Sequence, residues 1–181
     1  MSKIISKLSV ALVVALFVAS AVGQGAEKSD SPGGVRGEIL GEVDALEKKY
    51  VGLADAIPAD KYGWRPGEGV RSVSEVFVHV AVANYRLPYF IGTPPPDALP
   101  AEKDVTDKAE VMKHLKGSFE FVRKAVMNMS EDEIEKTSKM FGRDRTYREI
   151  GFFLAGHMHE HLGQLIAYSR MNGIVPPWSQ G

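Results

Sequence analysis

Three histidines stand at spacings that would let them bind one metal ion. His157 and His161 are four residues apart, so a helix would place both imidazoles on one face, one turn apart. Burying an imidazole costs free energy unless its nitrogens are satisfied, and a divalent metal ion satisfies both rings at once. Apolar residues recur at helical spacing around the pair and predict a buried stripe that includes it: Ile150, Phe153, Leu154, Leu165 and Tyr168.

A hydrogen-bonded pair without metal is the simpler alternative for His157 and His161, and a third histidine weighs against it. Ser72 and Glu75 form a capping box, which predicts a helix that starts at Ser72 and carries His79 about two turns inside. Apolar residues share the side of His79, which predicts a core-facing ring: Val76, Val80 and Ala83. The sequence therefore predicts that His79, His157 and His161 are the ligands of one metal ion.

The helix that carries the histidine pair has marked ends. Thr146 and Glu149 form a second capping box, and Asn172-Gly173 followed by Pro176-Pro177 ends the segment. Two further histidines, His114 and His159, fall out of phase with the apolar stripes, and we expect both at the surface.

The first residues look like a secretory signal peptide. Lys3 and Lys7 precede an apolar run over residues 8–22, and small residues follow where a signal peptidase would cut. A retained membrane anchor is the alternative, but the run of about 15 residues is short of the roughly 20 needed to span a bilayer. We expect a signal peptide over residues 1–23, a flexible linker over 24–34 and one domain over 35–181, exported to the periplasm or the extracellular space.

Composition narrows the chemistry that the mature chain can perform. The chain has no cysteine, which excludes disulfides, thiolate ligands and a cysteine nucleophile and leaves imidazole, carboxylate and water for any metal. Loss of Lys3 and Lys7 with the signal peptide would leave 20 basic against 23 acidic side chains, a formal charge of −3. This charge disfavours a nucleic-acid partner.

Periodicity predicts four amphipathic helices and hence an all-α, four-helix bundle. The first runs over about 35–56, the second carries His79 and weakens near Pro88, the third begins at Thr106 or Asp107, and the fourth carries the histidine pair. A short helix capped by Ser130 and a loop over residues 139–145 precede the fourth, and no strand pattern competes. The Glu-x-x-His pairs of di-iron bundles and the His-Glu-x-x-His motif of zinc proteases are both absent.

Several short motifs, in their order along the chain, resemble the DinB-like family of metal-binding four-helix bundles. They are residues 57–66 (Ile-Pro-Ala-Asp-Lys-Tyr-Gly-Trp-Arg-Pro), residues 70–75 leading to His79, and residues 157–164 followed by 168–173 and Pro176-Pro177. The resemblance covers most of the mature chain. It implies that His79, His157 and His161 correspond to the three ligands of the family, with nickel, zinc or another first-row divalent ion as the cofactor.

The resemblance does not imply one reaction. It includes thiol-dependent transferases and isomerases, although export would separate this chain from the cytosolic thiol pool. Three neutral imidazoles leave a coordination position for water or a small-molecule substrate, as in catalytic sites. No general base is evident, and we assign no catalytic role to Glu160 or Gln164. A metal-dependent transferase or hydrolase and a non-catalytic metal-binding or stress-related envelope protein both remain open, as does a homodimer.

Overall fold

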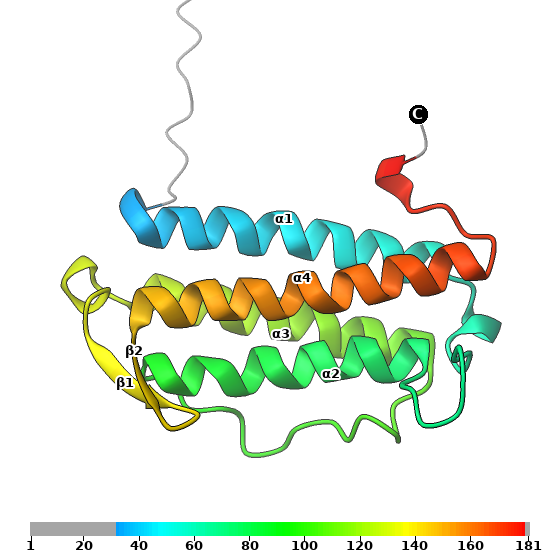
Figure 1. Ribbon diagram of the computed structural model, residues 1–181, viewed down its shortest axis with the longest axis horizontal. Coiled ribbons are helices and arrows are strands. Elements are labelled where there is room, and N and C mark those ends of the chain that lie inside the picture. Colours follow the sequence, from blue (N-terminus) through cyan, green and yellow to red (C-terminus); the bar gives the residue numbers. More distant parts are fainter. Residues whose placement is uncertain (1–31, 180–181) are drawn as a thin grey trace, which may run out of the picture. The chain divides into compact units, whose positions relative to one another are not determined.

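The computed structural model describes residues 32–179. Four helices pack side by side as a bundle (Figure 1), and they are α1 (Gly34–Ala56), α2 (Val73–Arg86), α3 (Lys108–Asn128) and α4 (Tyr147–Met171). The four-helix architecture expected from periodicity is therefore confirmed. The expected signal peptide over residues 1–23 and most of the 24–34 linker lie outside the described residues. No helix within residues 32–179 combines the length and apolar character needed to cross a bilayer.

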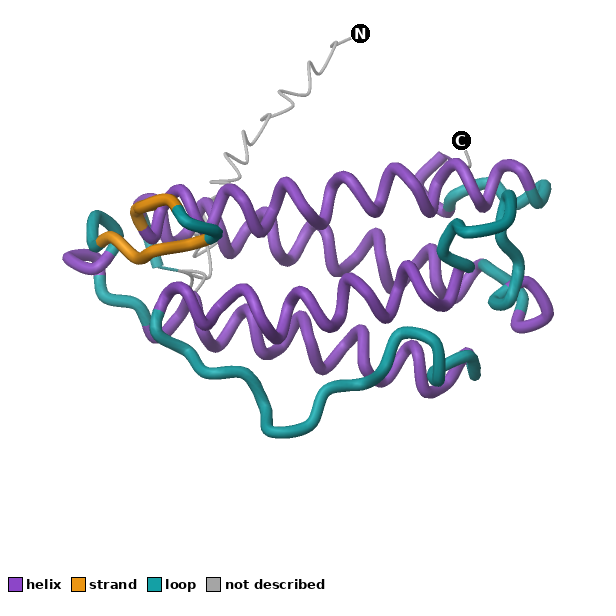
Figure 2. Tube along the Cα trace, turned by 60° about the horizontal axis from the view of Figure 1, so that its bottom comes forward, coloured by secondary structure: helices purple, strands orange, loops and turns teal. Residues whose placement is uncertain are grey.

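The four helices do not simply alternate in direction: α1 and α4 run one way, and α2 and α3 run the other way (Figure 1). Lys108, at the start of α3, donates hydrogen bonds to the carbonyls of Asp55 and Ile57 at the end of α1, at 2.6 and 2.9 Å. Because α2 and α3 are parallel, residues 92–107 must return along the length of the bundle. Figure 2 shows this long loop beside the helices. α2 and α4 are antiparallel neighbours, an arrangement that can bring His79 level with the other two histidines.

The core lies between the four helices and is closed by aromatic contacts. Tyr50 of α1 is fully buried, with its ring centre 5.6 Å from that of Phe119 and 6.3 Å from that of Phe77. Its hydroxyl donates to the carbonyl of Met158 in α4, which satisfies the one polar group that Tyr50 brings into the core. Apolar residues that recur at helical spacing in α1 and α3 are buried, among them Leu46 and Leu115.

Local signals set the helix ends where the sequence places them. The side chain of Asp107 accepts hydrogen bonds from the backbone N–H groups of Ala109 and Glu110 and so caps α3. Past Arg86 the chain tightens into a 3-10 helix, Leu87–Ile91, which contains Pro88. Three more short 3-10 turns connect the elements, and they are Ala59–Lys61, Glu131–Glu133 and Pro177–Ser179.

One part of the fold differs from the sequence-based expectation: the segment before α4 is a β-hairpin instead of a loop. Strand β1 (Thr137–Met140) pairs antiparallel with β2 (Arg143–Thr146), with Thr137 opposite Thr146 and Met140 opposite Arg143. The strand residues other than Met140 are polar, and their side chains are exposed or half-buried, so the apolar alternation typical of a strand is missing. Backbone pairing across the two-residue turn at Phe141 and Gly142 creates these strands.

Candidate metal centre

Two capping boxes fix the helices that carry the three histidines. At the start of α2, the Ser72 hydroxyl accepts from the N–H of Glu75, and the Glu75 carboxylate accepts from the N–H of Ser72 at 2.6 Å. Thr146 and Glu149 repeat this exchange at the start of α4. The Ser72 N–H, together with the cation of Arg65 3.2 Å away, holds the pKa of the Glu75 carboxyl below its usual range despite burial. Both helix starts that the sequence predicts are confirmed.

The three imidazoles meet between α2 and α4. The ring centre of His161 lies 4.6 Å from that of His79 and 4.6 Å from that of His157, and the other pair is 5.2 Å apart. One nitrogen from each ring can be chosen so that all three lie within 4.8 Å of one another. Nε2 of His157 is 3.2 Å from Nε2 of His79. Two nitrogens bound at about 2.05 Å to one tetrahedral ion would be about 3.3 Å apart, so this spacing fits a shared metal ion.

Polar side chains behind two of the rings direct their Nε2 atoms inward. Nδ1 of His79 donates to the carboxylate of Glu102 at 2.8 Å, and Nδ1 of His161 donates to the amide oxygen of Gln164 at 2.9 Å. Gln164 in turn donates to the hydroxyl of Tyr168 at 2.8 Å, which fixes the orientation of its amide. With the N–H on Nδ1, an imidazole in its neutral form has its lone pair on Nε2, the atom that can bind a metal ion. Such outer partners orient histidine ligands in known metal sites.

The electrostatics of the site favour the neutral form of His157 and His161. Burial lowers the pKa of His157 from its usual value to about 4, and the neighbouring His161 and His79 add to this effect. Burial also lowers the pKa of His161. Burial pushes the pKa of Glu102 upward, but hydrogen bonds from His79 and Arg71 outweigh it and hold that pKa below the usual range. A divalent ion binds an imidazole only in its neutral form, so the lowered pKa values of His157 and His161 favour metal binding.

The histidines do not face the core as fully as the sequence predicts. The buried stripe of α4 runs through Leu154, Met158, Leu162 and Leu165, while His157 and His161 are half-buried at its edge. His79 is also half-buried, although most other residues of α2 are buried. The core positions that the sequence assigns to His157 and His161 are taken by the next residues along the chain, Met158 and Leu162. The site therefore lies at the rim of the core, where small molecules can reach it.

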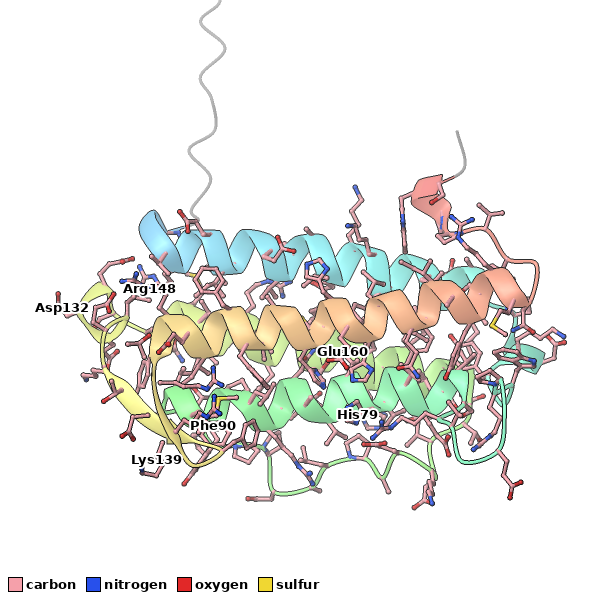
Figure 3. The ribbon with its side chains drawn as sticks, in the orientation of Figure 1. His79, Phe90, Asp132, Lys139, Arg148 and Glu160 are labelled. Carbon is pink, nitrogen blue, oxygen red and sulfur yellow. The ribbon has the colours of Figure 1, made fainter. Side chains whose placement is uncertain are left out.

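The remaining histidines stay apart from this cluster. His159 is exposed and bonds through Nε2 to the Glu42 carboxylate at 2.6 Å. His114 lies half-buried on α3 and is not part of the cluster of potential ligands. Glu160 is exposed, and Figure 3 labels it on α4 together with His79 on α2. His159 at the surface agrees with the sequence-based expectation, whereas His114 is less exposed than expected.

Sequence comparison assigns this bundle to a family. Residues 42–165 match the DinB superfamily, and the match covers more than half of the chain and includes all three clustered histidines. The chain belongs to the DinB superfamily. The resemblance noted from its motifs is thus confirmed.

Solved structures of similar fold agree with this assignment. A DinB-like protein from Bacillus cereus ATCC 10987 has a TM-score of 0.65 at 14% identity, over 77% of this chain and 93% of that one. A DinB-like protein from Bacillus subtilis has a TM-score of 0.60 at 19% identity, over 75% and 92%. A conserved protein from Enterococcus faecalis has a TM-score of 0.64 at 11% identity, over 77% and 98%. At such identities the likeness concerns the fold alone. No curated protein matches the sequence significantly.

Two features of the site in this DinB-superfamily chain could not be predicted from the sequence. The first is Glu102, which lies in the long 92–107 loop, where no periodicity predicts the path of the backbone. The second is a cavity of about 620 Å³ that opens beside His79 and His157 and is lined mainly by apolar side chains. Its lining comes from α2, the following 3-10 helix, the long loop, the hairpin tip and α4, so only the folded chain assembles it.

Proposed function

We propose that this chain binds one divalent transition metal ion through the Nε2 atoms of His79, His157 and His161, and that the ion acts on a small molecule. The convergence of three imidazoles, with a 3.2 Å separation between Nε2 of His79 and that of His157, carries the proposal. Imidazole ligands suit zinc, nickel and other first-row ions. The chain offers no thiolate that would favour a softer metal.

The proposed centre fits a metal-dependent transferase or hydrolase. A bound ion of this kind lowers the pKa of a coordinated water or thiol and polarises a carbonyl. The protein keeps the proton of His79 on Nδ1 through Glu102 and orients His161 through Gln164. The apolar cavity next to His157 would exclude water from a bound substrate and strengthen electrostatic interactions within it. With three protein ligands, the metal ion would keep a coordination position for water or substrate, whereas a structural site has four protein ligands.

The hydrogen bonds of Glu102 favour a second function, non-catalytic metal binding in the cell envelope. Among the residues that line the cavity, Glu102 supplies the carboxylate, and its two oxygens are engaged by His79 and by Arg71 at 2.8 and 2.9 Å. A carboxylate held in this way is a poor general base. Turnover of ester or thiol-transfer substrates that depends on added metal would decide for the enzyme.

Metal analysis of untagged protein tests the proposal. Elemental analysis should find about one zinc or nickel ion per chain, and replacing His157 and His161 together by alanine should abolish binding. The matched controls are His159→Ala and His114→Ala, which remove imidazoles outside the cluster. Cobalt(II) adds a second readout, because its visible absorption reports the geometry of its ligands. The assignment fails if the double variant keeps its metal and either control loses it.

Export of the mature domain is a further part of the proposal. It is supported by Lys3 and Lys7 in front of the apolar run over residues 8–22, a pattern typical of cleavable signal peptides. The formal charge of −3 expected after cleavage agrees with a protein that has no nucleic-acid partner.

A further inference from the structure

The cavity beside the histidines has the size and lining of a small-molecule site. Its volume of about 620 Å³ lies within the range of roughly 300–1,000 Å³ that is usual for ligand pockets. His79, Val82, Ala83 and Arg86 line it from α2. The last three residues lie three, four and seven positions after His79, so all four share one face of the helix. Arg86 is therefore about 10.5 Å along the helix axis from His79, and the cavity runs from the proposed metal toward this arginine.

Three phenylalanine rings form one wall of the cavity. Phe90 follows α2, Phe141 is at the tip of the hairpin, and Phe153 lies on α4, one turn before His157. The ring of Phe141 is centred 5.5 Å from that of Phe90 and 5.8 Å from that of Phe153. Figure 3 labels Phe90 beside the hairpin, on the same side of α4 as His79. An aromatic wall of this kind favours a ligand with a ring of its own.

Phe141 is an unusual choice for its position in the hairpin. It has a φ of 50° and Gly142 a φ of 80°, the two positive values of a tight two-residue turn. Such turns prefer Asn-Gly, because a bulky side chain is strained in the left-handed region. Phe141 is also 68% exposed, so its burial contributes little to the fold. Strain of this kind at a loop tip is typical of positions kept for a functional reason.

Arg86 supplies a positive charge at the other end of the cavity. It is exposed, and none of the ion pairs among residues 32–179 joins it to an acidic side chain. The Glu102 carboxylate that also lines the cavity is held by Arg71 and His79 at the metal end. An anionic group of a ligand would therefore meet a guanidinium that is free to bind it.

We propose that this cavity binds a small organic anion with an aromatic body. Its ring stacks against the wall of Phe90, Phe141 and Phe153, and its anionic group binds Arg86. The part of this molecule farthest from Arg86 would lie beside His79 and His157. That the molecule is a substrate therefore rests on the proposed function. Binding in the cavity does not itself require the metal ion, which allows the two proposals to be tested apart.

Calorimetric titration with 2-naphthoate and its neutral analogue 2-naphthamide tests the inference. Chelated, metal-free protein is used first, because a carboxylate could otherwise bind the metal instead of Arg86. We expect 2-naphthoate to bind about tenfold more tightly than 2-naphthamide, and Arg86→Gln to remove this preference. Arg170→Gln, an exposed arginine elsewhere, is the control. Equal binding of both probes to the wild-type protein, or a preference that survives in Arg86→Gln, would overturn the role of Arg86.

Phe141→Asn tests the aromatic wall without endangering the fold. Asn-Gly suits the turn better than Phe-Gly, so the melting temperature should stay the same or rise, while the affinity for 2-naphthoate should fall about tenfold. Phe152→Asn is the matched control, because Phe152 is 58% exposed on α4 and does not line this cavity. Equal affinity in wild type and Phe141→Asn would overturn the inference, as would no binding at millimolar probe.

A separate zinc titration of the wild-type protein distinguishes the two proposals. Zinc binding without 2-naphthoate binding refutes only the occupant proposed for the cavity. Binding of 2-naphthoate without zinc binding refutes only the metal centre and leaves the cavity as a site for an organic anion.

Discussion

Acid should destabilise the metal-free protein through His157. Its imidazole is half-buried beside two other histidines, and this burial lowers its pKa to about 4 in the folded chain. In the unfolded chain the same ring titrates at about 6.5. Between these values the unfolded state binds a proton that the folded state does not, so the free energy of unfolding must fall as the pH falls. This contribution to stability is complete above about pH 6.5 and is lost progressively toward pH 4.

The size of the effect follows from the two pKa values. At pH 4.5, a ring that titrates at about 4 in the folded state and about 6.5 in the unfolded state would cost at most about 2.6 kcal/mol of stability. His157 is only half-buried, so water screens part of this difference, and we expect about 1–2 kcal/mol. His161 has a pKa lowered in the same direction and adds to the loss in wild-type protein.

Urea unfolding of chelated protein at pH 7.0 and pH 4.5, followed by circular dichroism, measures this loss. His157→Gln removes the titrating ring but leaves the carboxylates and His161, so the wild type should lose about 1–2 kcal/mol more than this variant. His159→Gln, which removes an exposed imidazole outside the cluster, is the matched control. The reasoning is refuted if wild type and His157→Gln lose the same stability, or if His159→Gln alone reduces the loss.

Three further predictions concern the metal and the chain terminus. Glu102→Gln should weaken zinc binding roughly 10–100-fold in a competition titration with a chelator, while Glu110→Gln, an exposed acid on α3, should not. Zinc at a hundredfold excess over its Kd should stabilise the fold by about 2.7 kcal/mol, a rise of roughly 5–11 °C in Tm. No rise should occur when His157 and His161 are alanine. Protein recovered from its native host should begin within residues 22–27 by terminal sequencing, and an intact first residue on membrane-bound protein would contradict cleavage.

The helices of this fold could be predicted from the sequence because their signals are local. The capping boxes at Ser72 and Thr146 each involve residues three apart, and the side-chain cap at Asp107 spans two or three residues. Core stripes such as that of α3 also depend on spacing along one helix. The parallel order of α2 and α3 could not be predicted in this way, since it depends on the path of residues 92–107.

The three histidines were predictable as a set, but their surroundings were not. The i, i+4 spacing of His157 and His161 defines a shared face whatever the tertiary structure. How deeply that face is buried depends on where the neighbouring helix crosses it. Gly151 illustrates the point: a Cβ on this residue would lie 2.5 Å from Cδ1 of Ile39, so α1 approaches α4 closely there. This approach favours burial of the face of α4 that carries Gly151, and the histidines lie at its edge, beside the cavity.

The hairpin shows most clearly where local rules fail. Phe-Gly is a weak turn signal compared with Asn-Gly, and the strands beside it carry charged side chains, so the sequence favours a loop. The contacts of Phe141 that accompany the turn come from Phe90 and Phe153, which are 51 positions before and 12 positions after it in the chain. Phe141 is unfavourable in its turn, yet it lines a cavity formed with residues far away in the sequence. Local and global structure therefore favour different residues at this position. Such conflicts are expected at functional sites. The hairpin tip therefore belongs, with the three histidines, to the site that we propose.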